Sequence, residues 1–92
     1  MSTMQDREQD QVVEKHKRDS LNARIGEQLL QTLGRPGDLF KVQVRWVWEN
    51  SYRVNILVGV DASAVKVAHS FFLKADDDGN ILQTTPKIAK QY

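Results

Sequence analysis

The sequence predicts an α+β fold in which one N-terminal helix packs on a four-stranded antiparallel β-meander. Between Leu39 and Ala75, apolar and polar residues alternate with a period of two through three consecutive segments, which is typical of half-buried strands. Before them, apolar residues recur every four positions from Leu21 to Leu33, which is the spacing of one helix face. The chain of 92 residues has room for a single small domain.

The helix is expected over about Ser20–Leu33, either starting there or extending backwards through residues 11–18. Asp19 or Ser20 can accept hydrogen bonds from the first free amides, and Gly34 after the apolar stripe is a typical helix stop. Gly26 lies on or beside the stripe, and its missing side chain allows close approach to the sheet.

We divide the chain into a domain at residues 19–85 and two tails. Residues 1–18 are polar and densely charged with both signs, so we expect a flexible tail there. Residues 86–92 begin with a proline and form a short polar C-terminal tail.

The strand register follows from keeping apolar residues on one face. A three-residue loop over residues 49–51 keeps every pair apolar, whereas a two-residue loop at residues 50–51 mixes polar and apolar positions. The predicted pairs are Trp48 with Tyr52, Trp46 with Val54, Val44 with Ile56, Val42 with Val58 and Phe40 with Val60. The third segment adds Val65, Val67, His69, Phe71 and Leu73 to the same face.

The acidic segment at residues 76–80 is expected to be the turn before a fourth strand near Ile81–Thr84. Its aspartates and Gly79 are similar to the middle of a calcium loop, but Lys74 and Thr85 occupy the end positions where such a loop has carboxylates. We therefore interpret it as a turn and expect no metal.

Composition narrows the class of protein. The chain has no cysteine, which removes thiolate metal sites and cysteine nucleophiles, and its formal net charge of +1 favours no charged partner by itself. Its longest apolar run is Ile56–Val60, far below the roughly 20 residues of a membrane-spanning helix, and no signal peptide is recognised. We expect a soluble cytoplasmic protein that uses no cofactor and no membrane.

Catalysis is disfavoured because the sequence pattern brings no general base next to a nucleophile. His69 is predicted on the apolar face and Ser70 on the other, so the two cannot act as a base and its nucleophile. A small-ligand or enzyme pocket around Trp46, Tyr52 and His69 is left as an alternative.

The polar face of the sheet is predicted to be positive. Its only acidic neighbours between residues 39 and 75 are Glu49 and Asp61, both in turns. Such a face could bind nucleic acid or another polyanion weakly, although strand residues that face solvent are often basic for other reasons. The candidate residues are Lys41, Arg45, Arg53, Lys66, Phe72 and Lys74.

The first functional expectation is a small non-enzymatic interaction domain that forms a homodimer. Four strands make a sheet about 19 Å wide, whereas one helix is about 10–12 Å across, so one helix leaves apolar surface uncovered. Soluble monomers usually avoid such patches. Either the helix extends backwards and bends over the sheet, or a second copy covers the rest, and we expect the second copy with Trp46, Trp48 and Tyr52 at the interface.

Overall fold

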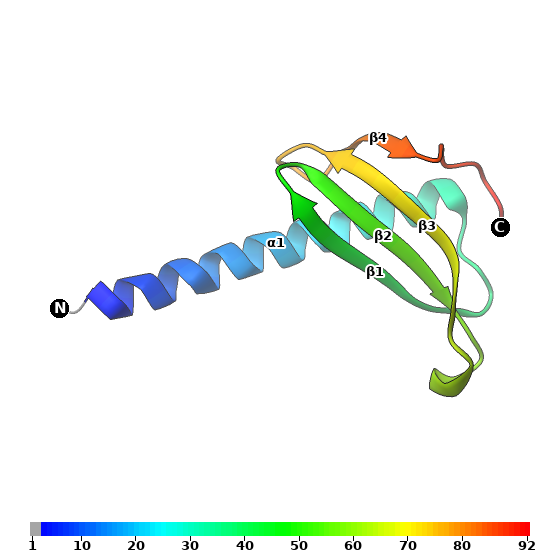
Figure 1. Cartoon of the computed structure of the whole chain (residues 1–92), viewed down its shortest axis with the longest axis horizontal. Helices are drawn as coiled ribbons and strands as arrows, with labels where there is room; N and C mark the ends of the chain where they lie inside the picture. The colour runs from blue at the N-terminus through cyan, green and yellow to red at the C-terminus, as the bar shows by residue number, and fades with distance from the viewer. Residues whose placement is uncertain (1–2) are drawn as a thin grey trace.

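The computed structural model describes residues 3–92, with side chains described from His16 onward, and it confirms the predicted architecture. Helix α1 (Thr3–Leu33) precedes strands β1 (Leu39–Trp48), β2 (Ser51–Val58), β3 (Lys66–Ala75) and β4 (Ile81–Thr85), with the 3-10 helix η1 (Ala62–Ala64) between β2 and β3. The strands form one antiparallel sheet in the order β1-β2-β3-β4, so β1 and β4 are its edges. Helix α1 lies against one face of this sheet (Figure 1).

Helix α1 is much longer than the predicted core helix, because it begins at Thr3. Residues 3–18 are rich in Gln, Glu, Lys and Arg, which sustain a helix by propensity even without an apolar stripe. The segment predicted as a tail is therefore helical from residue 3, while its flexibility stays a prediction. The N-terminal half of the helix projects away from the sheet and does not bend over it (Figure 1).

The predicted helix stop is confirmed. Helix α1 ends at Leu33, and Gly34 follows with φ 92°, a left-handed conformation that glycine adopts without steric cost. The amide of Gly34 donates to the carbonyl of Leu30 at 2.8 Å, which closes the last turn.

The register between β1 and β2 differs from the predicted one by two residues. Trp46 lies opposite Tyr52 and Val44 opposite Val54, so apolar residues still face each other, but the connecting turn contains only Glu49 and Asn50. Two features make this turn possible: Glu49 has φ 48°, and β1 contains an extra residue between Trp46 and Trp48. The predicted three-residue loop is therefore wrong. The β2 strand also stops at Val58, so Val60 lies outside the sheet and is exposed.

Between β2 and β3 the predicted pairing holds for most of the strand. Ile56 faces His69, and Arg53 faces Phe72, as expected. A register shift after Ile56 then places an extra residue, Ala68, in β3. As a consequence Val67 pairs with Leu57 on the face of the sheet opposite the core, which we call the open face. Val67 was predicted on the apolar face.

The core lies between the C-terminal half of α1 and the middle of the sheet. Gly26 allows the predicted close approach, since a Cβ built there would lie 3.3 Å from Cγ1 of Val42. Partly buried residues at the margin of the core include Val42, Val44 and Ile88. The fully packed side chains are Ile25, Leu29, Leu30, Leu33, Tyr52, Val54, Ile56, Val58, Phe71, Leu73 and Ala75.

The turn between β3 and β4 is tied to the helix by polar side chains. Nε2 of Gln28 donates to the carbonyl of Gly79 at 2.6 Å, and its Oε1 accepts from the amide of Ile81 at 3.2 Å. Arg24 donates to Oδ1 of Asn80 at 3.2 Å. These bonds fix the approach of the fourth strand, which the sequence placed correctly near residues 81–84.

The C-terminal segment contacts the domain at several points. Ile88 packs against the core, and the amides of Gln91 and Tyr92 both donate to the carbonyl of Leu33, at 2.7 and 3.2 Å. The Tyr92 hydroxyl lies 2.8 Å from Nε2 of His69. Residues 86–92, which we predicted as a tail, therefore cover part of the helix end and of β3.

Candidate functional site

The edge strand β1 carries a group of exposed apolar side chains that we call the β1 edge patch. Three of them are consecutive at the end of the strand: Trp46, Val47 and Trp48, with exposed fractions of 40%, 44% and 56%. Phe40 at the start of the strand is 47% exposed. Large apolar side chains exposed on an edge strand are unusual, because proteins usually protect such edges.

The bulge at Val47 determines how the two tryptophans point. Trp46 pairs with Tyr52 and Trp48 pairs with Ser51, and consecutive residues of β2 point to opposite faces. The two indoles therefore lie on opposite faces of the sheet edge, whereas we predicted both on the apolar face. The patch thus surrounds the edge of β1 and is not confined to one face.

Trp46 is held in place by two contacts of its indole ring. Its indole Nε1 donates to the carbonyl of Glu49 at 2.7 Å, which ties it to the turn. The guanidinium carbon of Arg18 lies 4.2 Å from the ring centroid, a cation–π contact with the helix. These contacts fix the orientation of the Trp46 side chain, while 40% of its surface still faces solvent.

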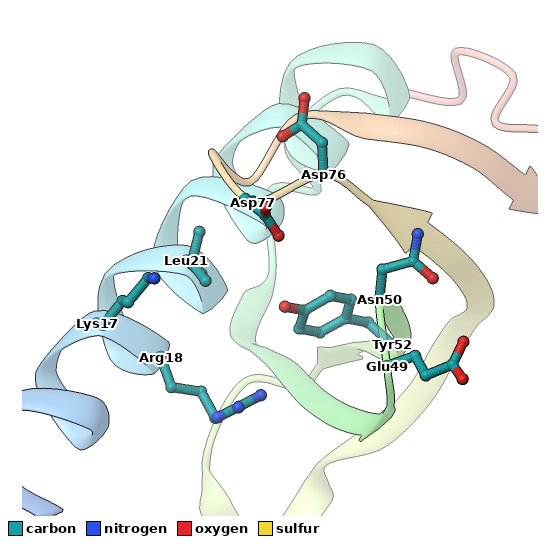
Figure 2. Close-up of a pocket in the computed structure, with 8 residues that line it drawn as sticks. All are labelled: Lys17, Arg18, Leu21, Glu49, Asn50, Tyr52, Asp76 and Asp77. Carbon is teal, nitrogen blue, oxygen red and sulfur yellow. The ribbon is translucent and has the colours of Figure 1, made fainter.

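Tyr52, the third predicted interface residue, is in the core with 4% of its surface exposed. Its ring borders a hollow of about 280 Å³ between helix α1, the β1–β2 turn and the β3–β4 turn. Figure 2 shows its hydroxyl directed toward the helix. The hollow is lined by Lys17, Arg18, Leu21, Glu49, Asn50, Tyr52, Asp76 and Asp77. Tyr52 presents too little surface to contact a protein partner directly, so we leave it out of the proposed interface.

The open face of the sheet contains a row of two arginines and one aromatic ring. Arg45 lies directly opposite Arg53, and Arg53 lies opposite Phe72, across β1, β2 and β3. All four strands lack carboxylates, so no acidic residue of the sheet neutralises this pair. Two like charges directly opposite each other are destabilising.

A neutral polar row lies beside these arginines. Asn55 donates through Nδ2 to Oε1 of Gln43 at 3.3 Å, and the hydroxyl of Ser70 donates to Oδ1 of Asn55 at 2.7 Å. The row spans the same three strands as Arg45, Arg53 and Phe72.

The other predicted cations of this face are placed unequally. Lys41 pairs with Leu57, and Lys74 with Ser51, so both belong to the open face. Lys66 pairs with Val58, a core residue, because the extra residue in β3 shifts the register. The structure therefore separates Lys66 from the other cations.

The alternative pocket around Trp46, Tyr52 and His69 is not assembled. Trp46 and Tyr52 are neighbours, but His69 faces Ile56, four positions further along β2, which is roughly 13 Å away at the rise of a strand. The half-buried ring of His69 instead stacks beside Phe71 and meets Tyr92 edge-on. Its role in the structure is packing and a hydrogen bond.

The acidic turn is closed by its own hydrogen bonds. Oδ1 of Asp76 accepts from the amides of Asp78 and Asn80 at 2.9 and 2.8 Å. The amide and side chain of Asn80 chiefly lower the pKa of Asp76. In the earlier connection between β2 and β3, the pKa of Asp61 is lowered mainly by a hydrogen bond from the Ser63 hydroxyl. Within the described residues no three potential metal ligands cluster, and no helix combines the length and apolar character of a membrane span.

Comparison with protein-family models, with curated proteins and with solved structures finds no match for this chain. Function must therefore be argued from its surfaces.

Sequence reasoning missed the four register shifts between neighbouring strands and the return of the C-terminal segment. The bulges decide where Trp48, Val67 and Lys66 lie, and no turn residue in the sequence marks them. One feature of the sequence could have indicated that Tyr92 packs on the domain: it is an aromatic residue in a largely polar C-terminal segment.

Proposed function

We propose that this protein is a small interaction domain that associates with a second copy of itself through the β1 edge patch. The observation that carries the proposal is the group of consecutive exposed residues Trp46, Val47 and Trp48 on an edge strand. Tryptophan is enriched at the centres of interfaces because it buries a large area at a small cost in conformational entropy.

A second copy is favoured because α1 contacts β1 but leaves the β1 edge patch exposed: Trp46, Val47 and Trp48 keep exposed fractions of 40%, 44% and 56% beside the helix. The N-terminal half of the helix projects beyond the sheet, and the C-terminal segment returns toward β3 and the helix end, away from β1. An identical surface on another copy supplies apolar area of the same kind, as in symmetric dimers.

The test is the mass of the protein in solution across a concentration series. Trp48→Gln is the informative variant, because Trp48 is the most exposed residue of the patch and makes no side-chain hydrogen bond with the described residues. Leu82→Gln is the matched control, since Leu82 is 61% exposed on the opposite edge strand β4. We expect a dimer that Trp48→Gln weakens by roughly tenfold or more and that Leu82→Gln leaves unchanged. A monomer of 10.5 kDa at every concentration rejects the proposal.

A second candidate function is weak binding of nucleic acid or another polyanion by the open face. It is favoured by the unneutralised pair Arg45 and Arg53 beside Phe72, because an anion bridging the two guanidinium groups removes their repulsion. Binding of labelled single-stranded and double-stranded oligonucleotides at low salt, compared between wild type and Arg45→Glu plus Arg53→Glu, tests it. The double variant is expected to bind more weakly, and absence of any binding by the wild type rejects this function.

A further inference from the structure

The free edge of β1 contains one regular stretch, residues 41–46. Register shifts interrupt β1 between Leu39 and Lys41 and between Trp46 and Trp48, and between them consecutive residues alternate regularly between the two faces. No strand of the sheet pairs with the outer side of this stretch, where Asn22 and Ala23 of α1 border a pocket with residues 41–44, so alternate backbone N–H and C=O groups there have no strand partner. A second copy offers the same edge.

We infer that two copies associate by antiparallel pairing of β1 with β1, with Val44 lying opposite Val44 of the second copy. The inference rests on the proposed function and specifies the surface and register through which self-association occurs. The resulting assembly is one continuous eight-stranded sheet with a two-fold axis at Val44.

Parity restricts the possible registers. In an antiparallel pair, two opposite residues have their side chains on the same face of the sheet. They also both direct their backbone N–H and C=O groups toward the partner strand, or both direct them away from it. A two-fold axis must therefore place some residue opposite its own copy. An axis at Gln43 pairs residues 41–45 and an axis at Val44 pairs residues 42–46, whereas axes elsewhere leave shorter regular pairings because the bulges intervene.

Charge decides between these two registers. An axis at Gln43 places Lys41 opposite Arg45 of the second copy, and symmetry repeats this repulsive pair. An axis at Val44 places the neutral amide of Gln43 opposite Arg45 instead, so no like charges lie directly opposite each other.

The same register completes the apolar face. It sets Val42 opposite the half-exposed Trp46 of the second copy and Val44 opposite itself, so every inner-face pair is apolar. Both valines already border the core, and the new pairs extend that core across the two-fold axis. Beyond the regular stretch, the exposed Trp48 of each copy comes to the end of β1 where Phe40 of the other copy is exposed.

The test is the effect of charge at position 43 on the dimer dissociation constant, measured by sedimentation equilibrium. Gln43→Glu keeps the size of the side chain and keeps an oxygen for the bond from Nδ2 of Asn55. In the Val44 register each introduced carboxylate lies opposite Arg45 of the other copy, so two pairs of opposite charges form. We therefore expect the dimer dissociation constant to fall by roughly two- to tenfold, and Gln43→Lys to raise it by a similar factor. Gln83→Glu and Gln83→Lys on the opposite edge strand β4 change the net charge equally and are expected to have no effect.

Engineered disulfides give an independent readout, because the chain contains no cysteine. Oxidation of a mixture of Gln43→Cys and Arg45→Cys proteins is expected to produce the mixed covalent dimer, since these positions lie opposite each other on an exposed face. Gln43→Cys alone is expected to cross-link poorly, because its copies are then diagonal neighbours about 7–8 Å apart.

The outcomes separate the two proposals. A monomer at all concentrations rejects self-association itself. A dimer that Gln43→Glu weakens, or that Gln43→Cys alone cross-links more efficiently than the mixture, overturns the Val44 register while the proposed function stands. A dimer insensitive to every change at position 43 rejects the β1 edge as the pairing surface.

Discussion

The hydroxyl of Tyr92 lies 2.8 Å from Nε2 of His69, so residue 92 is joined to the middle of β3 by a side-chain hydrogen bond. The same residue donates its backbone amide to the carbonyl of Leu33 at the end of α1. Together these bonds connect the helix end, the C-terminal segment and the third strand. This connection is made on the side of the sheet away from the β1 edge.

The first prediction concerns this bond. Tyr92→Phe and His69→Phe each keep an aromatic ring and remove one partner, so each is expected to lower the free energy of unfolding by about 0.5–1.5 kcal/mol. The double variant should lose little more than either single one, because the bond can be lost only once. Urea denaturation of the four proteins measures this coupling. Fully additive losses would show that the two side chains act independently.

The second prediction concerns Gly34, which combines φ 92° with close contact to the C-terminal segment. A Cβ built at this position lies 2.6 Å from the carbonyl oxygen of Tyr92, so an alanine must both accept left-handed backbone and displace the segment. We expect Gly34→Ala to destabilise the protein by roughly 1–3 kcal/mol from the backbone strain, with a further loss from displacement.

Two controls divide that loss. Gly37→Ala should be close to neutral, because nothing lies within 4 Å of a Cβ at Gly37. Deleting residues 91–92 removes the steric conflict, so Gly34→Ala should cost less in the shortened chain than in the full one. Thermal or urea denaturation that finds equal costs in both backgrounds would contradict the proposed role of the contact.

The fold could be predicted because its determinants are local and periodic. The spacing from Leu21 to Leu33 identifies the helix face, Gly34 identifies its end, and the alternation from residue 39 identifies the strands. The start of the helix was misplaced because residues 3–18 form helix without burying an apolar face, and hydrophobic periodicity is insensitive to such a segment.

The details of the candidate site were harder to predict, because β-bulges have no distinctive sequence pattern. Parity correctly placed Trp46 and the row of Arg53 and Phe72, since these lie between the irregularities. It failed for Trp48 and Lys66, which lie beyond a bulge and so change faces. A single inserted residue reverses the face of every position after it until the strand ends.

The third prediction is a pH dependence that arises from Asp76. Hydrogen bonds from the amide and side chain of Asn80, the amide of Asp78 and the nearby charge of Arg24 lower the pKa of Asp76 below its ordinary value of 3.8. The ionised carboxylate therefore stabilises the folded state above pH 3.8, and this contribution is lost as the pH falls through the lowered pKa.

Asp76→Asn removes the charge and keeps the shape of the side chain, so it tests this contribution directly. The difference in unfolding free energy between wild type and Asp76→Asn should be greatest near neutral pH and should shrink below pH 3.8. Asp77→Asn removes the same charge from the neighbouring exposed residue and serves as the control. Urea denaturation from pH 7 to pH 2.5 measures the difference, and a difference that is constant with pH would refute the assignment to Asp76.

The fourth prediction distinguishes how the open face would hold a polyanion. Phe72 is 37% exposed and lies opposite Arg53, so a base stacked on its ring would have its phosphate beside a guanidinium group. Stacking requires unpaired bases, which a duplex does not offer. Phe72→Leu keeps an apolar side chain for packing and is therefore expected to weaken single-stranded oligonucleotide binding by about 1–3 kcal/mol while leaving duplex binding unchanged. Fluorescence anisotropy with both kinds of oligonucleotide at the same low salt measures the two effects. Equal weakening of both would mean that Phe72 supports the fold of the face without contacting bases, and no weakening of either would leave the contribution of this face to the arginines alone.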